Sequence, residues 1–324
     1  MILAKTPFRV SLIGGGTDLP EFFQRHGRGA VVSAAIDKYM YVMIHPYFHD
    51  KLRVKYSQTE DVERVEDLKH PIVRECLKLL KIGSGLEITS VADVPSGLGL
   101  GSSSSFTVCL LQALYAHEGR YVSKKTLAER ACNIEIERLK EPIGKQDQYA
   151  ASFGGISHLQ FNADGSVERE NLMLAPEVTV EISRRLLLFY IGAPRAARDI
   201  LSEQREGILR EGRYEAASRL VDLADVMRSA IKAGRLGDVG EILHEGWTLK
   251  KTLASGVTND GIDDVYERAR QAGAAGGKLL GAGGGGFMLF YCKPEAQAGL
   301  RRALGLRELS LGWDRQGSRV ICNE

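Results

Sequence analysis

Alternating apolar and polar residues predict a β-strand at the start of the chain. Over Ile2–Ile13, apolar residues such as Val10 alternate with polar residues such as Arg9, as expected for a strand with one buried face. A run of glycines follows it, so we expect Asp18 to be exposed where this strand ends.

Further strands are predicted from runs of β-branched and aromatic residues. Two such runs cover Ala30–Ile36 and Tyr39–Phe48. The polar pair Asp37-Lys38 lies between them, so we expect the two runs to form a hairpin. Another strand is expected over Leu86–Val94.

Apolar residues that recur every three or four positions predict helices. A first helix covers Leu68–Leu80 and stops near Gly83. The continuous apolar run Phe106–Ala116 predicts a buried helix. Ser123 is a suitable N-cap for a third helix, which runs to about Lys140.

The pattern changes after about residue 161, and this change together with the length of 324 residues favours two domains, residues 1–170 and 171–324. The elements expected in the second domain are the strand Leu186–Ile191, the helices Arg195–Glu211, Tyr214–Ala233 and Asp260–Ala272, and the strand Phe287–Tyr291.

The stretch Val94–Ser105 is rich in glycine and serine. Gly97, Gly99 and Gly101 are followed at once by four serines and then by the predicted apolar helix. A glycine loop lets the backbone approach a ligand, and the helix N-terminus behind it offers free N–H groups and a positive dipole end to phosphate. A glycine turn before a serine-capped core helix gives the same pattern.

Two familiar nucleotide-binding motifs are excluded. No Gly-x-x-x-x-Gly-Lys-Ser/Thr occurs, so the loop is not a Walker loop. Gly281, Gly283 and Gly286 match Gly-x-Gly-x-x-Gly, but a predicted strand follows them, whereas the dinucleotide fingerprint opens a helix.

Two carboxylates, those of Glu135 and Asp147, are candidate metal-binding or reactive groups. Glu135 falls in the middle of the apolar stripe of the helix that begins at Ser123, and a lone buried carboxylate is costly unless it is paired or holds a metal. An ion pair with an arginine or lysine would also satisfy it. Asp147 follows a loop at Gly144 and is either a helix N-cap or a reactive group.

Charge and cysteine content narrow the class of protein. The 43 Lys and Arg residues nearly balance the 41 Asp and Glu residues, so nothing favours nucleic acid as a partner. There is no apolar stretch of membrane-spanning length and no signal-peptide layout, so we expect no membrane association. Five scattered cysteines form no metal or disulfide framework, and we expect a cytoplasmic protein. The sequence does not predict an oligomeric state.

Three glycine-rich stretches, Thr6–Asp18, Pro95–Ser105 and Lys278–Phe287, resemble in this order those of the GHMP kinases, the small-molecule kinases that include galactokinase, homoserine kinase and mevalonate kinase. Together with Glu141–Ala151, they are most similar to the D-glycero-D-manno-heptose 7-phosphate kinases within this family. Fucokinases share many of the same sequence motifs. Gly15 and Gly16 stand where galactokinases have an acidic residue and a histidine, so we expect a different sugar pocket.

The resemblance implies an α+β fold with a ribosomal-protein-S5-like N-terminal domain, which contains a left-handed βαβ unit, and a ferredoxin-like C-terminal domain. The active site would lie between them. It implies ATP and Mg²⁺ as cofactors and phosphorylation of the anomeric hydroxyl of a sugar phosphate. For the heptose subgroup the product is heptose 1,7-bisphosphate, which leads to nucleotide-activated heptose for surface polysaccharide.

The resemblance also implies roles for individual residues. Asp147 matches the catalytic base, and Arg9 matches the cation that steadies the transferred phosphoryl group and favours ionised Asp147. Ser103 and Glu135 would share Mg²⁺. The residues expected to bind ATP are Pro95, Gly97, Leu98, Gly99, Gly101, Ser102, Ser103 and Ser104. The residues expected to bind the sugar substrate are Asp18, Gly15, Gly16, Thr17, Lys145, Arg195, Gly283 and Gly284.

A 7-phosphate on the sugar would need a cation of its own. The candidates are Arg28, Lys145, Arg195, Arg198 and Lys278. Two other functions fit the sequence: a kinase for an unphosphorylated sugar such as fucose, which would need no such cation, and a ligand sensor without activity. The sensor is disfavoured because Arg9, Ser103, Glu135 and Asp147 are all present.

Overall fold

The computed structural model of the chain describes residues 1–192 and 197–324. Its larger sheet has the strand order β12-β1-β2-β5-β3-β4, and β6 and β7 extend it from β2. All neighbours are antiparallel except β3 and β5. The strands are β1 (Ile2–Ile13), β2 (Arg28–Pro46), β3 (Leu52–Lys55), β4 (Thr59–Val62), β5 (Leu86–Ala92), β6 (Ile156–Asn162), β7 (Val167–Asn171) and β12 (Arg319–Asn323).

The predicted hairpin between Ala30–Ile36 and Tyr39–Phe48 is wrong, because both runs belong to the single strand β2. Asp37 and Lys38 lie where the pairing of β2 with β1 shifts register, between Pro7↔Tyr39 and Arg9↔Ala35. They are accommodated as a bulge, which lets a strand bend without reversing. The first half of β2 pairs with β6 and its second half with β5.

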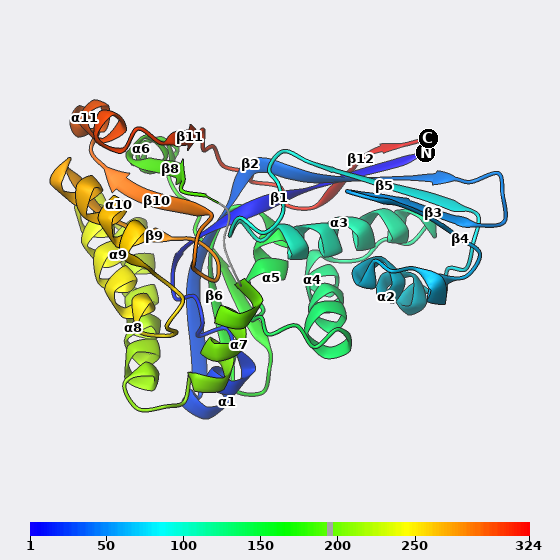
Figure 1. Cartoon of the computed structure of the whole chain (residues 1–324), viewed down its shortest axis with the longest axis horizontal. Coiled ribbons are helices and arrows are strands. Elements are labelled where there is room, and N and C mark those ends of the chain that lie inside the picture. Colours follow the sequence, from blue (N-terminus) through cyan, green and yellow to red (C-terminus); the bar gives the residue numbers. More distant parts are fainter. Residues whose placement is uncertain (193–196) are drawn as a thin grey trace.

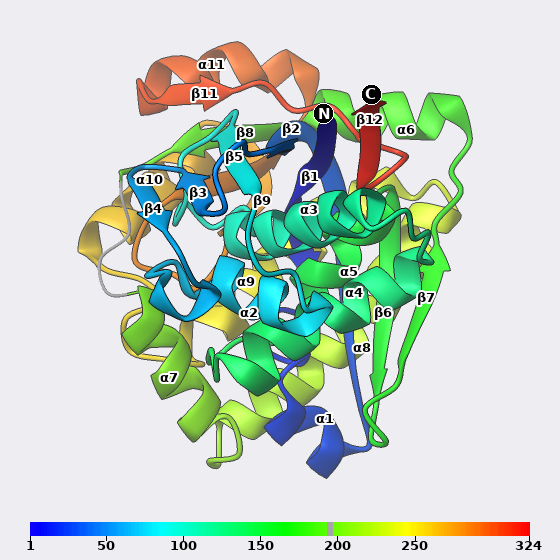
Figure 2. The same ribbon diagram turned by 90° about the vertical axis from the view of Figure 1, so that its right-hand side faces the viewer.

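Helices cover one face of this sheet (Figure 1). Figure 2 shows α3 across the sheet with α2, α4 and α5 beside it. The predicted apolar helix is confirmed as α3, which is almost completely buried. The helices of this part are α1 (Pro20–His26), α2 (Pro71–Leu80), α3 (Ser102–His117), α4 (Lys124–Cys132) and α5 (Gln146–Phe153), with a 3-10 turn Val65–Asp67 and a π-helical turn Asn133–Arg138 after α4.

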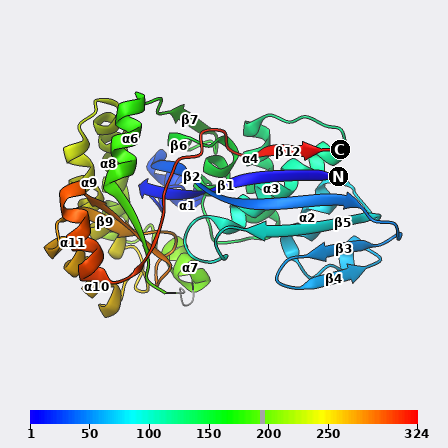
Figure 3. The same cartoon turned by 90° about the horizontal axis from the view of Figure 1, so that it is seen from above.

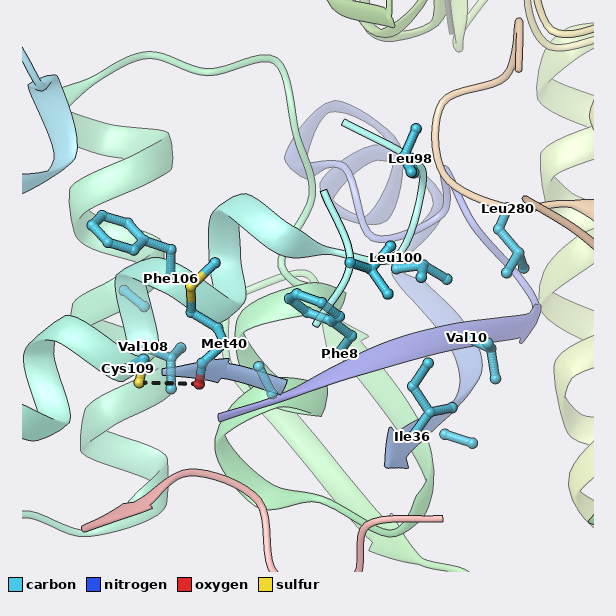
Figure 4. Close-up of a cluster of buried hydrophobic side chains, with 14 of the residues drawn as sticks. Phe8, Val10, Ile36, Met40, Leu98, Leu100, Phe106, Val108, Cys109 and Leu280 are labelled. Carbon is cyan, nitrogen blue, oxygen red and sulfur yellow. Dashed lines mark hydrogen bonds between the residues drawn. The ribbon is translucent and has the colours of Figure 1, made fainter. Parts of the chain in front are cut away.

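The glycine-rich loop is anchored in the core by its leucines. Figure 4 shows Leu100 near Phe8 of β1 and Leu280, which comes from the distant third glycine-rich stretch. All three side chains are buried. The same view shows the Cys109 thiol of α3 donating to the Met40 carbonyl at 3.5 Å. Core packing therefore fixes the loop between segments that are far apart in the chain.

The second part of the chain is built on a smaller antiparallel sheet with the order β11-β8-β10-β9. The predicted strands near 186–191 and 287–291 are confirmed as β8 and β10. Its strands are β8 (Leu186–Tyr190), β9 (Ala274–Leu279), β10 (Phe287–Cys292) and β11 (Arg307–Leu309). Its helices are α6 (Pro176–Arg185), α7 (Ala197–Gly207), α8 (Arg213–Lys232), α9 (Leu236–Lys251), α10 (Asp260–Gln271) and α11 (Pro294–Leu304).

The chain ends beside its beginning. Strand β12 pairs with β1, and Figure 3 shows both termini at the same edge of the larger sheet. The division into residues 1–170 and 171–324 stays a prediction. The last strand, β12, lies in the sheet of the first part of the chain. Within the described residues, no helix is long and apolar enough to cross a membrane.

Close backbone approach holds α9 against β9. A Cβ atom on Gly276 of β9 would lie 1.9 Å from the carbonyl oxygen of Gly240 in α9. Gly276 does not have a positive φ, so the constraint here is space alone. We therefore predict that Gly276→Ala lowers the free energy of unfolding by about 1–3 kcal/mol, as overpacking typically does.

Denaturant unfolding of purified protein measures this change. Gly237→Ala, in the helix α9 that Gly276 contacts, is the control, because nothing lies within 4 Å of its added Cβ. We expect it to leave the stability equal or slightly raised. A Gly276→Ala protein as stable as this control would contradict the packing argument.

Candidate functional site

A cavity of about 610 Å³ lies where elements of both parts of the chain meet. β1, the glycine-rich loop and the starts of α3 and α5 line one side of it. α7, α9 and the loop between β9 and β10 line the other. The three glycine-rich stretches noted in the sequence therefore converge on one space.

The second glycine-rich stretch opens α3 without a side-chain cap. Gly97, Gly99 and Gly101 all have positive φ angles, and Gly101 itself is the N-cap of α3. The first intrahelical hydrogen bond runs from Ser105 N–H to Gly101 O. The N–H groups of residues 102–104 therefore have no intrahelical partner, and all three residues line the cavity. This geometry suits phosphate better than a serine-capped core helix would.

Arg9 connects the loop to Asp147. Its Nε and Nη2 donate to the two carboxylate oxygens of Asp147 at 2.6 and 2.7 Å, and its Nη1 donates to the Gly99 carbonyl at 2.6 Å. The Arg9 side chain is only 4% exposed, whereas that of Asp147 is 22% exposed and faces the cavity. Asp147 lies in the first turn of α5 and is not its N-cap. The carboxylate is thus held in one orientation with a free edge toward any ligand.

Glu135 is completely buried and has no basic partner in the described parts of the chain. Ser103 Oγ and Gln148 Nε2 each donate to one of its carboxylate oxygens at 2.7 Å. Burial raises its pKa to about 7, although these hydrogen bonds partly oppose the rise. The alternative of a buried ion pair with an arginine or lysine is wrong. Glu135 lies in the π-helical turn, a distortion frequent at functional sites.

The pair Ser103 and Glu135 fits Mg²⁺. Mg²⁺ takes oxygen ligands, keeps several waters and uses few protein carboxylates when substrate phosphates complete its shell. Among the residues described, no group of three or more His, Cys, Asp or Glu side chains could hold a metal ion. One hydroxyl and one carboxylate beside the uncapped start of α3 are compatible with this kind of Mg²⁺ coordination.

The expectation that Asp18 is exposed is wrong: it lines the cavity near Asp147 and is only 4% exposed, because it is held against the backbone before α5. Its carboxylate accepts from the backbone N–H groups of Gly16 at 3.0 Å and Gln146 at 3.1 Å. Burial raises its pKa, and these hydrogen bonds oppose the rise. The Ser11 hydroxyl and the Gln146 side-chain oxygen are buried nearby without a partner in residues 1–192 and 197–324. Such orphaned polar atoms are suited to bind hydroxyl groups.

Several predicted site residues line this cavity, namely Arg9, Gly15, Gly16, Asp18, Gly97, Gly99, Gly101, Ser102, Ser103, Ser104, Asp147 and Gly283. Glu135 lies behind Ser103. Pro95, Leu98, Thr17, Lys145 and Gly284 are not part of the lining. The Thr17 hydroxyl contacts the carbonyl groups of Gly14 and Ala30, and Lys145 donates to the Gly165 carbonyl. Arg195 lies outside the described residues.

Sequence reasoning missed Gln204 and Lys250, which also line the cavity. Lys250 belongs to α9, a helix that was not predicted. A signal was present: Lys250 follows Leu243 and Trp247 at helical spacing, so a charged residue lies on an apolar face, as for Glu135. Of the other 7-phosphate candidates, Arg28 is paired with Asp225, Arg198 with Glu141, and Lys278 lines the cavity.

Comparisons with known proteins agree with this geometry. The family model "GHMP kinases N terminal domain" matches residues 71–155, and "GHMP kinases C terminal" matches residues 227–307. D-glycero-alpha-D-manno-heptose 7-phosphate kinase of Campylobacter jejuni is 30% identical to the chain over 315 residues, which cover 94% of this chain and 93% of that protein. The chain belongs to the GHMP kinases.

Two further matches have lower sequence identity. L-fucokinase/L-fucose-1-P guanylyltransferase of Bacteroides fragilis is 27% identical over 94% of the chain, which spans 36% of that longer protein. The crystal structure of a D-glycero-D-manno-heptose 1-phosphate kinase from Bacteroides thetaiotaomicron superposes with a TM-score of 0.82 at 23% identity, covering all of both chains. These matches confirm the α+β GHMP kinase fold that the resemblance implied.

The pKa of Glu135 generates a prediction about Mg²⁺. Mg²⁺ binds the ionised carboxylate, so protons compete with it below pH about 7. We expect the affinity for Mg²⁺ in the presence of ATP to fall roughly tenfold per pH unit below 7 and to level off above 8. Glu135→Gln is the control, since it retains only the pH dependence of ATP itself. Identical pH profiles for both proteins would contradict Glu135 as a ligand.

The raised pKa of Glu135 also predicts how the stability of the protein depends on pH. The folded pKa of this carboxylate lies above the ordinary value of 4.5, so it lowers stability progressively as the pH rises from about 4.5 to about 7. Glu135→Gln removes this loss, and we expect the metal-free variant to be at least as stable as the wild type at pH 8. Thermal unfolding at pH 8 measures the stability of both proteins, and it also shows whether the variant folds.

Proposed function

We propose that this GHMP kinase transfers the γ-phosphoryl group of ATP to the anomeric hydroxyl of D-glycero-D-manno-heptose 7-phosphate. The observation that carries the proposal is the position of Asp147, which Arg9 holds beside the uncapped start of α3 and near Asp18 in the cavity lining. The similarity to the C. jejuni heptose 7-phosphate kinase supports the choice of substrate.

Asp147 acts as the base in this proposal. Its free carboxylate edge accepts the proton of the attacking hydroxyl while Asp18 and its neighbours hold the sugar. Arg9 offers positive charge beside the phosphoryl group as it moves between donor and acceptor. Positioning and charge neutralisation supply most of the rate in phosphoryl transfer, so the rigid Arg9–Asp147 geometry matters as much as the basicity of Asp147.

The loop Gly97–Ser104 binds the ATP phosphates through the N–H groups at the start of α3. Ser103 and Glu135 hold Mg²⁺, which when bound neutralises charge on the phosphates. The aromatic side chains of Tyr56, His70 and Phe106 line the same end of the cavity. We assign the adenine to this cluster, in which the His70 ring lies 4.8 and 5.1 Å from its two neighbours between ring centroids.

The proposed reaction implies where the protein acts and which partners it needs. An ATP-dependent kinase of a free sugar phosphate acts in the cytoplasm, without a membrane or nucleic-acid partner. Its 1,7-bisphosphate product suits a route to nucleotide-activated heptose for surface polysaccharide. A sugar-1-kinase for an unphosphorylated sugar is the second candidate, favoured by the similarity to the B. fragilis L-fucokinase.

Consumption of ATP by purified protein with Mg²⁺ tests the proposal. The acceptors are heptose 7-phosphate, free heptose, mannose 6-phosphate, fucose and galactose. We expect turnover with heptose 7-phosphate and a loss of about 10²–10⁴-fold in kcat for Asp147→Asn with little change in ATP binding. Turnover with a free sugar alone would discard the heptose assignment, and full activity of Asp147→Asn would discard the base.

A further inference from the structure

Two lysines from the second part of the chain are buried in the floor of the cavity. Lys250 of α9 is 6% exposed and Lys278 of β9 is 3% exposed, and both line the cavity beside Arg9. Buried lysines are rare because the ammonium group loses its hydration, so each needs a compensating partner. The proposed roles of Arg9, Ser103, Glu135 and Asp147 use neither of them.

The two ammonium groups have different surroundings. Lys250 Nζ donates to the carbonyl oxygens of Leu279 at 2.9 Å and Gly281 at 2.6 Å. Lys278 makes no hydrogen bond or ion pair with any residue in the described ranges 1–192 and 197–324. Lys250 therefore anchors the third glycine-rich stretch, while the Lys278 amine lines the cavity without a partner among the described residues.

Electrostatics agree with this difference. Burial lowers the pKa of Lys250 to about 7, and the neighbouring charge of Arg9 lowers it further. Burial also lowers the pKa of Lys278 well below its ordinary value, and Lys250 and Arg9 add to the effect. Arg9, Lys250 and Lys278 thus disfavour one another's charged forms, and an anion bound between them would favour those forms.

The carboxylates of the cavity are engaged elsewhere. Asp147 is paired with Arg9, and Glu135 accepts from Ser103 and Gln148. Asp18 accepts from backbone N–H groups, and Glu141 is paired with Arg198. None of them forms an ion pair with Lys250 or Lys278 in the described structure. An anion that compensates the two lysines would therefore have to come from a ligand.

We propose that Lys278, with Lys250 beside it, binds a phosphate group of the substrates on the floor of the cavity. The group is either the phosphoryl group in transit from ATP or the phosphate already carried by the sugar. Lys250 is a positioning residue, since its hydrogen bonds hold the Gly281 loop against the site. This inference rests on the proposed kinase activity and assigns to it a second cation centre beyond Arg9.

Lys278→Met tests the proposal, because methionine replaces the lysine at similar volume without the charge. We expect kcat/KM with the sugar phosphate to fall by about 10²-fold or more, and the midpoint of thermal unfolding to equal or exceed that of the wild type, because a buried charge is removed. The matched control is Lys251→Met in α9, where the lysine pairs with Asp263 outside the cavity lining.

Two acceptors separate the sources of the phosphate. If Lys278 contacts the phosphoryl group in transit, Lys278→Met lowers kcat with both the sugar phosphate and the corresponding free sugar. If it contacts the phosphate of the sugar, KM rises for the sugar phosphate alone. Kinetic constants within twofold of the wild type for both acceptors would overturn the proposal. So would lost activity with a lowered unfolding midpoint, which indicates a structural role.

Sulfate binding keeps this test independent of the identity of the sugar. At constant ionic strength and without ATP or sugar, replacing chloride by sulfate should raise the unfolding midpoint of the wild type and of Lys251→Met more than that of Lys278→Met. If no sugar phosphate is turned over but this difference persists, the proposed substrate fails and the anion site stands. Equal sulfate responses in all three proteins would overturn the anion site.

Discussion

The bidentate pair between Arg9 and Asp147 is the interaction on which the rest of the site depends. Arg9 comes from strand β1 and Asp147 from the first turn of α5, and the third hydrogen bond of Arg9 reaches the Gly99 carbonyl. One buried guanidinium therefore fixes the carboxylate and the phosphate loop relative to each other. Such fork-to-fork pairing fixes orientation as well as distance.

The second constraint is contact between backbones. A Cβ atom on Gly99 would lie 2.5 Å from the Leu280 carbonyl oxygen, and one on Gly281 would lie 2.5 Å from the Gly99 Cα. Both residues also have positive φ angles. Glycine is needed on both sides because the loops from the two parts of the chain touch through their main chains. This contact brings Lys250 and Lys278 to the same cavity as Arg9.

Much of this site could be predicted from the sequence, because its signals are local. Glycine spacing predicted a glycine loop that leads into helix α3, and the helical position of Glu135 predicted its burial. The π-helical turn around Glu135 left no such signal, since it arises from tertiary packing. Asp37-Lys38 looked like a turn but form a bulge, because whether two extended runs reverse or continue is decided by the partners β5 and β6.

Contributions from the second part of the chain were harder to predict. Helix α9 is interrupted by Gly237, Gly240 and Gly246, which lowers its apparent helix propensity. At Gly240 the reason is tertiary, since a Cβ there would lie 2.5 Å from that of Ala275. Helix propensity contains no information about this close contact between α9 and β9, so the helix was not predicted and Lys250 at its end was overlooked. Lys278 was among the predicted cation candidates, but its burial depends on the packing of β9 against α9.

The most direct test of the central claim is a double-mutant cycle on Arg9 and Asp147. kcat/KM is measured for Arg9→Met, Asp147→Asn and the double variant. If the two side chains act as one unit, the double variant loses no more activity than the more damaged single variant, because the second substitution removes nothing that still functions. Losses that multiply would show that Arg9 and Asp147 act independently, and would contradict the account.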